Sequence, residues 1–182
     1  MGTRQHPEHF HATLTRMTAA QDDHWDAVQE AVELLHAGEH PRALHRLKAQ
    51  VTAQPDNAYA HFYLATALYE AKRYALALPH YVRALELSPR YLGALLGSGH
   101  CLRMLQRWDA AIRVGKQMLL QQPNDADAHY LLGTAYHGRG DSEAAREHLT
   151  AFLTQKPEFE VALEVEALLQ QLQPEAPEEP AP

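Results

Sequence analysis

Cysteine is almost absent from this sequence, which has one, Cys101, among 182 residues. A single cysteine excludes an internal disulfide and any metal site built on a cysteine pair. Apolar runs are short as well. None approaches the ~18 residues of a membrane-spanning helix, and the N-terminal stretch lacks the apolar segment of a signal peptide. We therefore expect a cytoplasmic protein without membrane insertion, in which Cys101 is a small buried apolar residue.

The motifs of common enzyme classes are missing too. The sequence contains no glycine-rich phosphate loop, no H-E-x-x-H pair and no recognisable pairing of a nucleophile with a base. His6, His9 and His11 form a histidine-rich stretch, but no set of cysteines or carboxylates completes a metal site around them. We therefore expect a protein that is not an enzyme and that uses no metal and no cofactor.

Basic residues are absent from the C-terminal segment. Residues 24–157 contain 14 Lys and Arg against 13 Asp and Glu, whereas residues 158–182 contain seven acidic residues and no basic one. Because the chain has no basic excess, we expect no binding to nucleic acid or to anionic lipid. Residues 174–182 contain only Pro, Glu and Ala, a composition that predicts a disordered acidic Pro-rich tail.

The sequence does contain a repeat of fixed length. Four prolines, at residues 55, 89, 123 and 157, follow one another at intervals of 34 residues. Such a period is the signature of a repeat protein whose units stack on one another. When each proline is placed at position 32, the units begin at residues 24, 58, 92 and 126, with small residues at positions 8 and 20 and mostly large ones at positions 11 and 24. These residues are Ala31, Ala65, Gly99 and Gly133 at position 8, Ala43, Ala77, Ala111 and Ala145 at position 20, Leu34, Leu68, Leu102 and Tyr136 at position 11, and Leu47, Tyr81, Gly115 and Leu149 at position 24.

This pattern resembles the tetratricopeptide repeat (TPR), W-x2-L-G-x2-Y followed by A-x3-F and P. The fourth repeat fits it well, with Leu132, Gly133, Tyr136 and Ala145 at the expected places. The third repeat departs from it at Gly115, where a large residue is expected. The resemblance covers residues 24–157 and implies that each unit is a pair of antiparallel helices, near positions 1–14 and 17–30.

The implied architecture is an all-α, right-handed α-solenoid of four helix-turn-helix units. Gly38 and Gly140 fall between paired helices, where a left-handed residue ends the first helix. Asn57 and Asp125 precede first helices and are expected to cap them. The expected domains are an N-terminal arm, partly helical or disordered (1–23), four repeats (24–57, 58–91, 92–125 and 126–157), a capping helix (158–173) indicated by Val161, Val165, Leu168 and Leu172, and the disordered tail (174–182).

The resemblance also implies a binding surface. In this family, positions 2, 5, 9 and 12 of the first helices usually line a concave groove. In this chain the groove is mainly aromatic in the second repeat and mixed polar in the later repeats, which suits a peptide or helix with apolar anchors. The candidate groove residues are Tyr59, Phe62, Tyr69, Gly93, Leu96, Gly97, His100, Arg103, Tyr130 and His137.

Two details qualify this groove. Gly93 and Gly97 share a helix face, which predicts either a trough for a bulky ligand group or close packing against the neighbouring helix. The subfamily that clamps the C-terminal carboxylate of chaperones carries Lys and Asn at positions 5 and 9. Because Val28 and Val32 stand at those positions in the first repeat, the chain does not resemble that clamp.

The leading functional hypothesis is a non-catalytic protein–protein interaction scaffold that holds a partner peptide or helix in the concave groove. Three alternatives stay open at this point: a secretion-type chaperone for a hydrophobic client, a self-assembling structural module that forms homo-oligomers, and an accessory subunit of an enzyme complex. In the N-terminal arm, Phe10, Leu14 and Met17 have helical spacing. The arm therefore either docks on the first repeat, occupies the groove until a partner displaces it, or is disordered.

Overall fold

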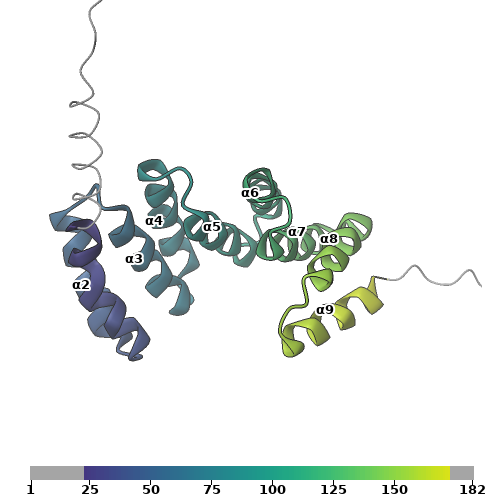
Figure 1. The fold of residues 1–182 in the computed structure, drawn as a ribbon, viewed down its shortest axis with the longest axis horizontal. Coiled ribbons are helices and arrows are strands. Elements are labelled where there is room, and N and C mark those ends of the chain that lie inside the picture. Colours follow the sequence, from purple (N-terminus) through teal and green to yellow (C-terminus); the bar gives the residue numbers. More distant parts are fainter. Residues whose placement is uncertain (1–22, 173–182) are drawn as a thin grey trace, which may run out of the picture. The chain divides into compact units, whose positions relative to one another are not determined.

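The computed structural model describes residues 23–172 (Figure 1). Within that range every regular element is an α-helix, so the predicted all-α fold is confirmed. The chain divides into two compact units, Met1–Ala94 and Leu95–Pro182, and the division falls inside one helix. The predicted arm and tail lie outside the described residues. The helices are residues 23–36, α2 (His40–Ala53), α3 (Ala58–Glu70), α4 (Tyr74–Leu87), α5 (Leu92–Met104), α6 (Trp108–Gln121), α7 (Ala126–Arg139), α8 (Ser142–Thr154) and α9 (Phe159–Gln171).

The first unit packs α3 against both α2 and α4. The alanines at positions 8 and 20 of its repeats are buried, as the pattern predicts: Ala31, Ala43, Ala65 and Ala77 are all at most 4% exposed. Small side chains at these points let two helices approach closely, so larger neighbours such as Leu47 fill the space beside them.

The second unit packs α7 between α6 and α8, and α8 also contacts α9. Its unusual Gly115 has a clear packing reason. A Cβ at this position would lie 2.6 Å from Cγ of Leu132, closer than real side chains approach. The large residue that the repeat pattern expects at position 24 is therefore supplied from α7 instead.

Each turn between paired helices contains one residue with positive φ, always at position 15 of the repeat. Gly38 and Gly140 have φ of 75° and 87°, as expected for glycine that ends a helix. Lys72 and Gln106 both have φ of 57° at the equivalent positions. A side chain in this left-handed region is strained, so two turns keep the shared geometry at a cost in stability.

The predicted caps are present at two first helices. The Asn57 side chain accepts a hydrogen bond from the backbone N–H of Ala60 at 3.0 Å, and that of Asp125 accepts one from Ala128 at 2.7 Å. At the start of α5 the corresponding residue is Tyr91, whose side chain cannot accept in this way. This repeat has therefore exchanged a helix cap for an aromatic ring.

Candidate functional site

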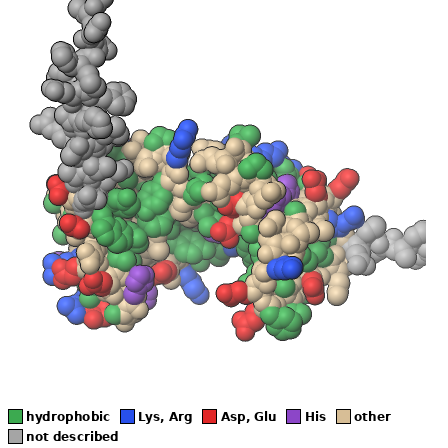
Figure 2. Space-filling view, viewed as in Figure 1, with side chains coloured by type: hydrophobic (Ala, Val, Ile, Leu, Met, Phe, Trp, Pro, Cys, Tyr) green, Lys and Arg blue, Asp and Glu red, His purple; other side chains and the backbone are tan. Residues whose placement is uncertain are grey.

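Five aromatic side chains of the first unit form a connected cluster, here called the aromatic face: Trp25, Tyr59, Phe62, Tyr63 and Tyr91. They come from the helix over residues 23–36, from α3 and from the turn before α5. Figure 2 shows hydrophobic side chains gathered where α3 is labelled in Figure 1. The face thus draws on three successive segments of the repeat array.

The rings of the aromatic face meet mainly at steep angles. The centroid of Trp25 lies 5.8 Å from that of Tyr59, and Tyr59 lies 6.0 Å from Tyr91, both in edge-to-face contact. Phe62 sits among the tyrosines, 5.0 Å from Tyr63 and 4.6 Å from Tyr91. These arrangements are favourable for aromatic pairs, so the side chains stabilise one another in one geometry.

The aromatic face remains open to solvent. Trp25 is 38% exposed, and the other four side chains are half-buried. Burial, aided by the neighbouring tyrosines, raises the pKa of Tyr91 well above its ordinary value, and burial also raises the pKa of Tyr63. Their hydroxyl groups therefore stay protonated at neutral pH. The surface offers rings and neutral hydroxyls, which suits an uncharged or apolar ligand segment.

Gly93 contributes to this face by lacking a side chain. A Cβ there would lie 3.1 Å from the Phe62 ring, which already occupies the adjacent space. Of the two interpretations offered by the sequence, close packing against a neighbouring helix therefore fits Gly93 better than an open trough. The bulky group next to this glycine is the protein's own Phe62.

The remaining candidates in the first unit fall into different surroundings. Tyr69 lies against Tyr74, with ring centroids 5.2 Å apart, at the other end of α3. Val28 and Val32 occupy groove positions of the first repeat but are 0% and 7% exposed. These two valines belong to the core, because here the helix over residues 23–36 turns that side inward.

The second unit holds the more polar candidates. Leu96, Gly97, His100, Arg103 and Tyr130 are half-buried, and His137 is exposed. Burial, helped by the nearby positive charge of Arg103, lowers the pKa of His100 to about 4. The imidazole is therefore neutral at physiological pH. The Tyr130 ring packs 5.2 Å from that of Phe152, on α8.

One donor of this second group lacks a hydrogen-bond partner. The Nε of Arg103 is buried and has no hydrogen-bond partner within the part of the chain that the structure describes. A buried donor without a partner is costly. Arg103 therefore keeps one unmet hydrogen-bonding group in its half-buried side chain.

Sequence reasoning placed Tyr59 and Phe62 in the site but omitted Tyr63 and Tyr91. Tyr63 occupies position 6 and Tyr91 position 34, outside the usual groove positions of the family. The signal that could have found Tyr91 is the broken capping pattern. Two other repeats carry Asn and Asp at this position, where they cap a helix. A tyrosine there cannot serve as such a cap, which indicates another role.

In each unit, one repeat contains a pair of histidines that links the two helices of that repeat. The two pairs occupy the same repeat positions. Nδ1 of His61 lies 3.1 Å from Nδ1 of His80, and His129 and His148 show the same distance. The Nε2–H of His61 donates to the carbonyl oxygen of Pro55 at 3.1 Å, so its Nδ1 accepts from the Nδ1–H of His80. These contacts give His61 and His129 a structural role between paired helices.

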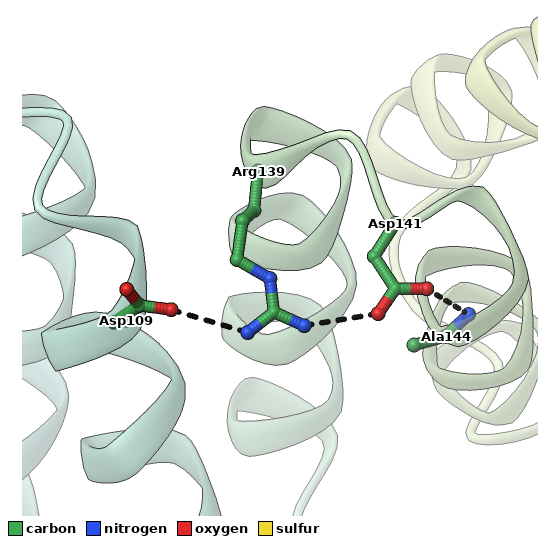
Figure 3. Close-up of polar contacts among 4 residues, drawn as sticks. All are labelled: Asp109, Arg139, Asp141 and Ala144. Carbon is green, nitrogen blue, oxygen red and sulfur yellow. Dashed lines mark hydrogen bonds and ion pairs between the residues drawn. The ribbon is translucent and has the colours of Figure 1, made fainter.

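A separate polar cluster links three helices of the second unit (Figure 3). The Arg139 guanidinium donates to Asp109 at 3.1 Å and to Asp141 at 2.9 Å. Asp141 also accepts from the backbone N–H of Ala144, and this bond, followed by the one from Arg139, lowers the pKa of its carboxyl group. These groups satisfy one another, so the cluster holds helix ends in place and leaves no acid or base free for chemistry.

The described residues 23–172 contain neither a metal-binding cluster nor a membrane-spanning helix. Among them, no group of three or more His, Cys, Asp or Glu side chains is arranged to hold a metal ion. None of their helices combines the length and apolar character needed to cross a membrane. Cys101 is buried, and burial raises the pKa of its thiol to about 12, as expected for a packing residue.

Comparisons with known proteins agree with the repeat architecture. Solved structures similar to this chain include MamA 41-end from Desulfovibrio magneticus RS-1, with a TM-score of 0.66 and 21% identity, covering 82% of this chain and 95% of that one. TTC0263, a thermophilic TPR protein in Thermus thermophilus, has a TM-score of 0.63 and 21% identity, covering 82% and 80%. At these identities the likeness concerns the fold.

A curated relative is the general transcriptional corepressor ssn6 of Schizosaccharomyces pombe, 24% identical over 161 residues. The match spans 87% of this chain but 14% of that protein. Family models described as tetratricopeptide repeat match residues 68–133 and 105–172, and another such model matches residues 28–91. Proteins of this kind are generally interaction scaffolds, and the chain belongs to the tetratricopeptide repeat family.

Proposed function

We propose that this protein is a non-catalytic scaffold whose aromatic face binds a partner peptide or helix through apolar anchors. The observation that carries the proposal is the half-exposed packing of the five rings on the first unit. Aromatic side chains offer a large contact area for little loss of conformational freedom, and they dominate the energetics of many interfaces. Their mutual packing holds the surface ready before a partner arrives.

Tyr91 is the most informative member of the face. Its position carries Asn57 and Asp125 in the neighbouring repeats, where each caps a helix. Losing such a cap costs about 0.5–2 kcal/mol. A binding role for the ring explains why this repeat lacks the cap, since local rules tend to be broken where function requires it.

The proposed partner segment is apolar with a few polar contacts. The tyrosine hydroxyls of the face can donate to or accept from a peptide backbone, whereas no charge of the face itself selects a charged ligand. The second unit carries its own proposed binding residues, with Arg103 and His100 as polar contacts. Leu96, Gly97, Tyr130 and His137 complete that set.

A peptide-display selection tests this proposal. Peptides selected on the wild-type protein are titrated against Phe62→Ala and Tyr91→Asn variants, after circular dichroism shows equal helicity. Leu120→Ala serves as the matched control, because Leu120 is an apolar side chain that is 86% exposed on α6 and is not a member of the aromatic face. We expect at least tenfold weaker binding for the two face variants and no change for the control. Equal binding by all variants, or no selectable peptide, would contradict the proposal.

A secretion-type chaperone is the neighbouring possibility, because the same face could shield an apolar client segment. It predicts that the client aggregates alone and stays dispersed with the wild-type protein but not with Phe62→Ala. An accessory role in an enzyme complex predicts co-purification at a fixed stoichiometry. The cytoplasmic location inferred from the sequence stays a prediction that fractionation of cells can check.

A further inference from the structure

The first unit has a hollow of about 320 Å³ between α2, α3 and α4. It shares no residue with the aromatic face. Its floor is apolar, with Val51, Leu68 and Leu76 among the lining side chains, and Lys48 and Arg73 stand at its edge. A hollow of this size can accept a large apolar side chain, and its basic edge favours a ligand that carries carboxylates.

The two edge cations are available for such a ligand. Neighbouring arginines of the same unit are paired, Arg42 with Glu39 and Arg46 with Glu30. Among residues 23–172, by contrast, the side chains of Lys48 and Arg73 form no ion pair, and both residues are exposed. The hollow therefore combines an apolar floor with positive charge that is not paired with any carboxylate among the described residues of its unit.

The complementary surface is on the second unit, at α9. Val165 on α9 is buried, and so is Leu172 just after the helix. One side of α9 therefore faces its own unit. On the opposite side Phe159 is 75% exposed and Leu163, one turn later, is 47% exposed. Glu160, Glu164 and Glu166 are exposed on the same helix, which carries no basic residue. The free side of α9 is thus apolar at its centre and acidic around it.

We propose that α9 of one copy docks in the hollow of a second copy. Phe159 enters the apolar floor beside Leu68 and Leu76, and the glutamates of α9 meet Lys48 and Arg73. A second copy fits as the occupant because this chain itself presents an exposed aromatic residue framed by carboxylates, opposite in charge to the edge of the hollow.

The proposed contact joins two different surfaces of the same protein. Such a heterologous contact leaves each pair with one free α9 and one unfilled hollow, so association can continue from copy to copy. One apolar anchor and a few ion pairs make a small interface, and small interfaces are weak and transient. We therefore expect association that rises with protein concentration and weakens, without disappearing, as salt screens the carboxylates.

Sedimentation analysis of the full chain and two variants tests the contact. Phe159→Asp removes the anchor but leaves the hollow intact, whereas Lys48→Glu/Arg73→Glu reverses the edge of the hollow but leaves α9 intact. All three residues are exposed, so both variants are expected to keep the wild-type helicity, which circular dichroism checks. We expect a wild-type mass that grows with concentration and a monomer for each variant alone.

Mixing the two variants provides the decisive arm. Each contributes the surface that the other lacks, so an equimolar mixture should form a dimer that contains one copy of each and grows no further. Leu120→Asp, which places the same charge on another exposed leucine, should associate like wild type. A wild-type monomer at every concentration, variants that associate like wild type, or a mixture that stays monomeric would each overturn the proposal. A mixture that stays monomeric while wild type associates would place the contact elsewhere.

Discussion

The two units follow one repeat plan but differ in where they place aromatic rings and glycines. In the first unit, rings crowd together and stay half-exposed around Phe62. In the second unit, glycines let leucines enter: Leu132 fills the space at Gly115, and Leu149 lies where Gly133 lacks a side chain. The histidine pair, by contrast, occurs in both units with the same spacing. Features shared by both units follow from the packing of a helix pair, whereas features of one unit are better evidence of function.

Exchanging position 24 between the units should have the largest effect on stability. Tyr81 fills this position in the second repeat, where it contacts Phe62 and its hydroxyl lies 3.2 Å from that of Thr66. We expect Tyr81→Gly to lower the free energy of unfolding by about 3–5 kcal/mol through cavity formation. Gly115→Tyr should destabilise the second unit through overpacking against Leu132, by about 1–3 kcal/mol or more.

Urea denaturation followed by circular dichroism measures both changes. The control for Gly115→Tyr is the double variant with Leu132→Ala, which removes the side chain that occupies the site and should recover part of the lost stability. A Gly115→Tyr variant as stable as wild type would show that α7 can move aside, and the contrast between the units would then be one of sequence only.

Acidification should weaken both units, and the second more strongly. Burial lowers the pKa of His61 and His80 in the first unit and of His148 in the second, and it lowers that of His100 to about 4. Below the unfolded-state pKa near 6.5 the unfolded chain binds protons more readily than the folded one, so stability is complete above that pH and is lost as the pH falls toward 4. His100 alone accounts for about 3 kcal/mol of this loss.

The measurement is the urea midpoint as a function of pH for wild type and His100→Gln. The variant should lose less stability between pH 7 and 5 than wild type does. His80→Gln is the companion in the first unit, where a pair can share one extra proton across its hydrogen bond but not two. A pH profile that neither variant changes would assign the acid sensitivity to other groups.

Replacing Tyr91 with asparagine separates binding from stability. The new residue can cap α5 as Asn57 caps α3, which offsets the lost ring contacts, so we expect the free energy of unfolding to change by no more than about 1 kcal/mol. Binding of a selected peptide should nevertheless fall at least tenfold. Thermal denaturation and titration of one preparation test the two statements together, and a parallel loss of both would assign Tyr91 a structural role.

The smallest expected effects are at position 15. Lys72→Gly and Gln106→Gly should each stabilise the protein by about 1 kcal/mol, because glycine adopts the left-handed conformation without strain. Gly38→Ala and Gly140→Ala should destabilise it by a similar amount. Chemical denaturation of the four variants compares one turn of each unit in both directions. Substitutions without effect would indicate that the turns relax to another conformation.

The sequence was sufficient for the helices, because each depends on local spacing: the alanines at position 20, the periodic prolines and the residues that cap or end helices. It was insufficient for contacts between distant positions. The pairing of His61 with His80 depends on two helices meeting, and the place of Leu132 beside Gly115 depends on two repeats meeting. Tyr63 was not predicted because its repeat position is not one of the usual groove positions of the family. Val28 shows the converse, because it occupies a usual groove position but belongs to the core.

The interlock of Leu132 with Gly115 bears on how such an array can change over time. At this junction a Cβ on residue 115 would lie 2.6 Å from Cγ of Leu132. At the first junction, by contrast, the equivalent places hold Leu47 and Leu64, and both side chains are buried. Duplication or recombination of these modules is therefore limited by the fit at each junction, and their order is a heritable property of the chain rather than an accident of copying.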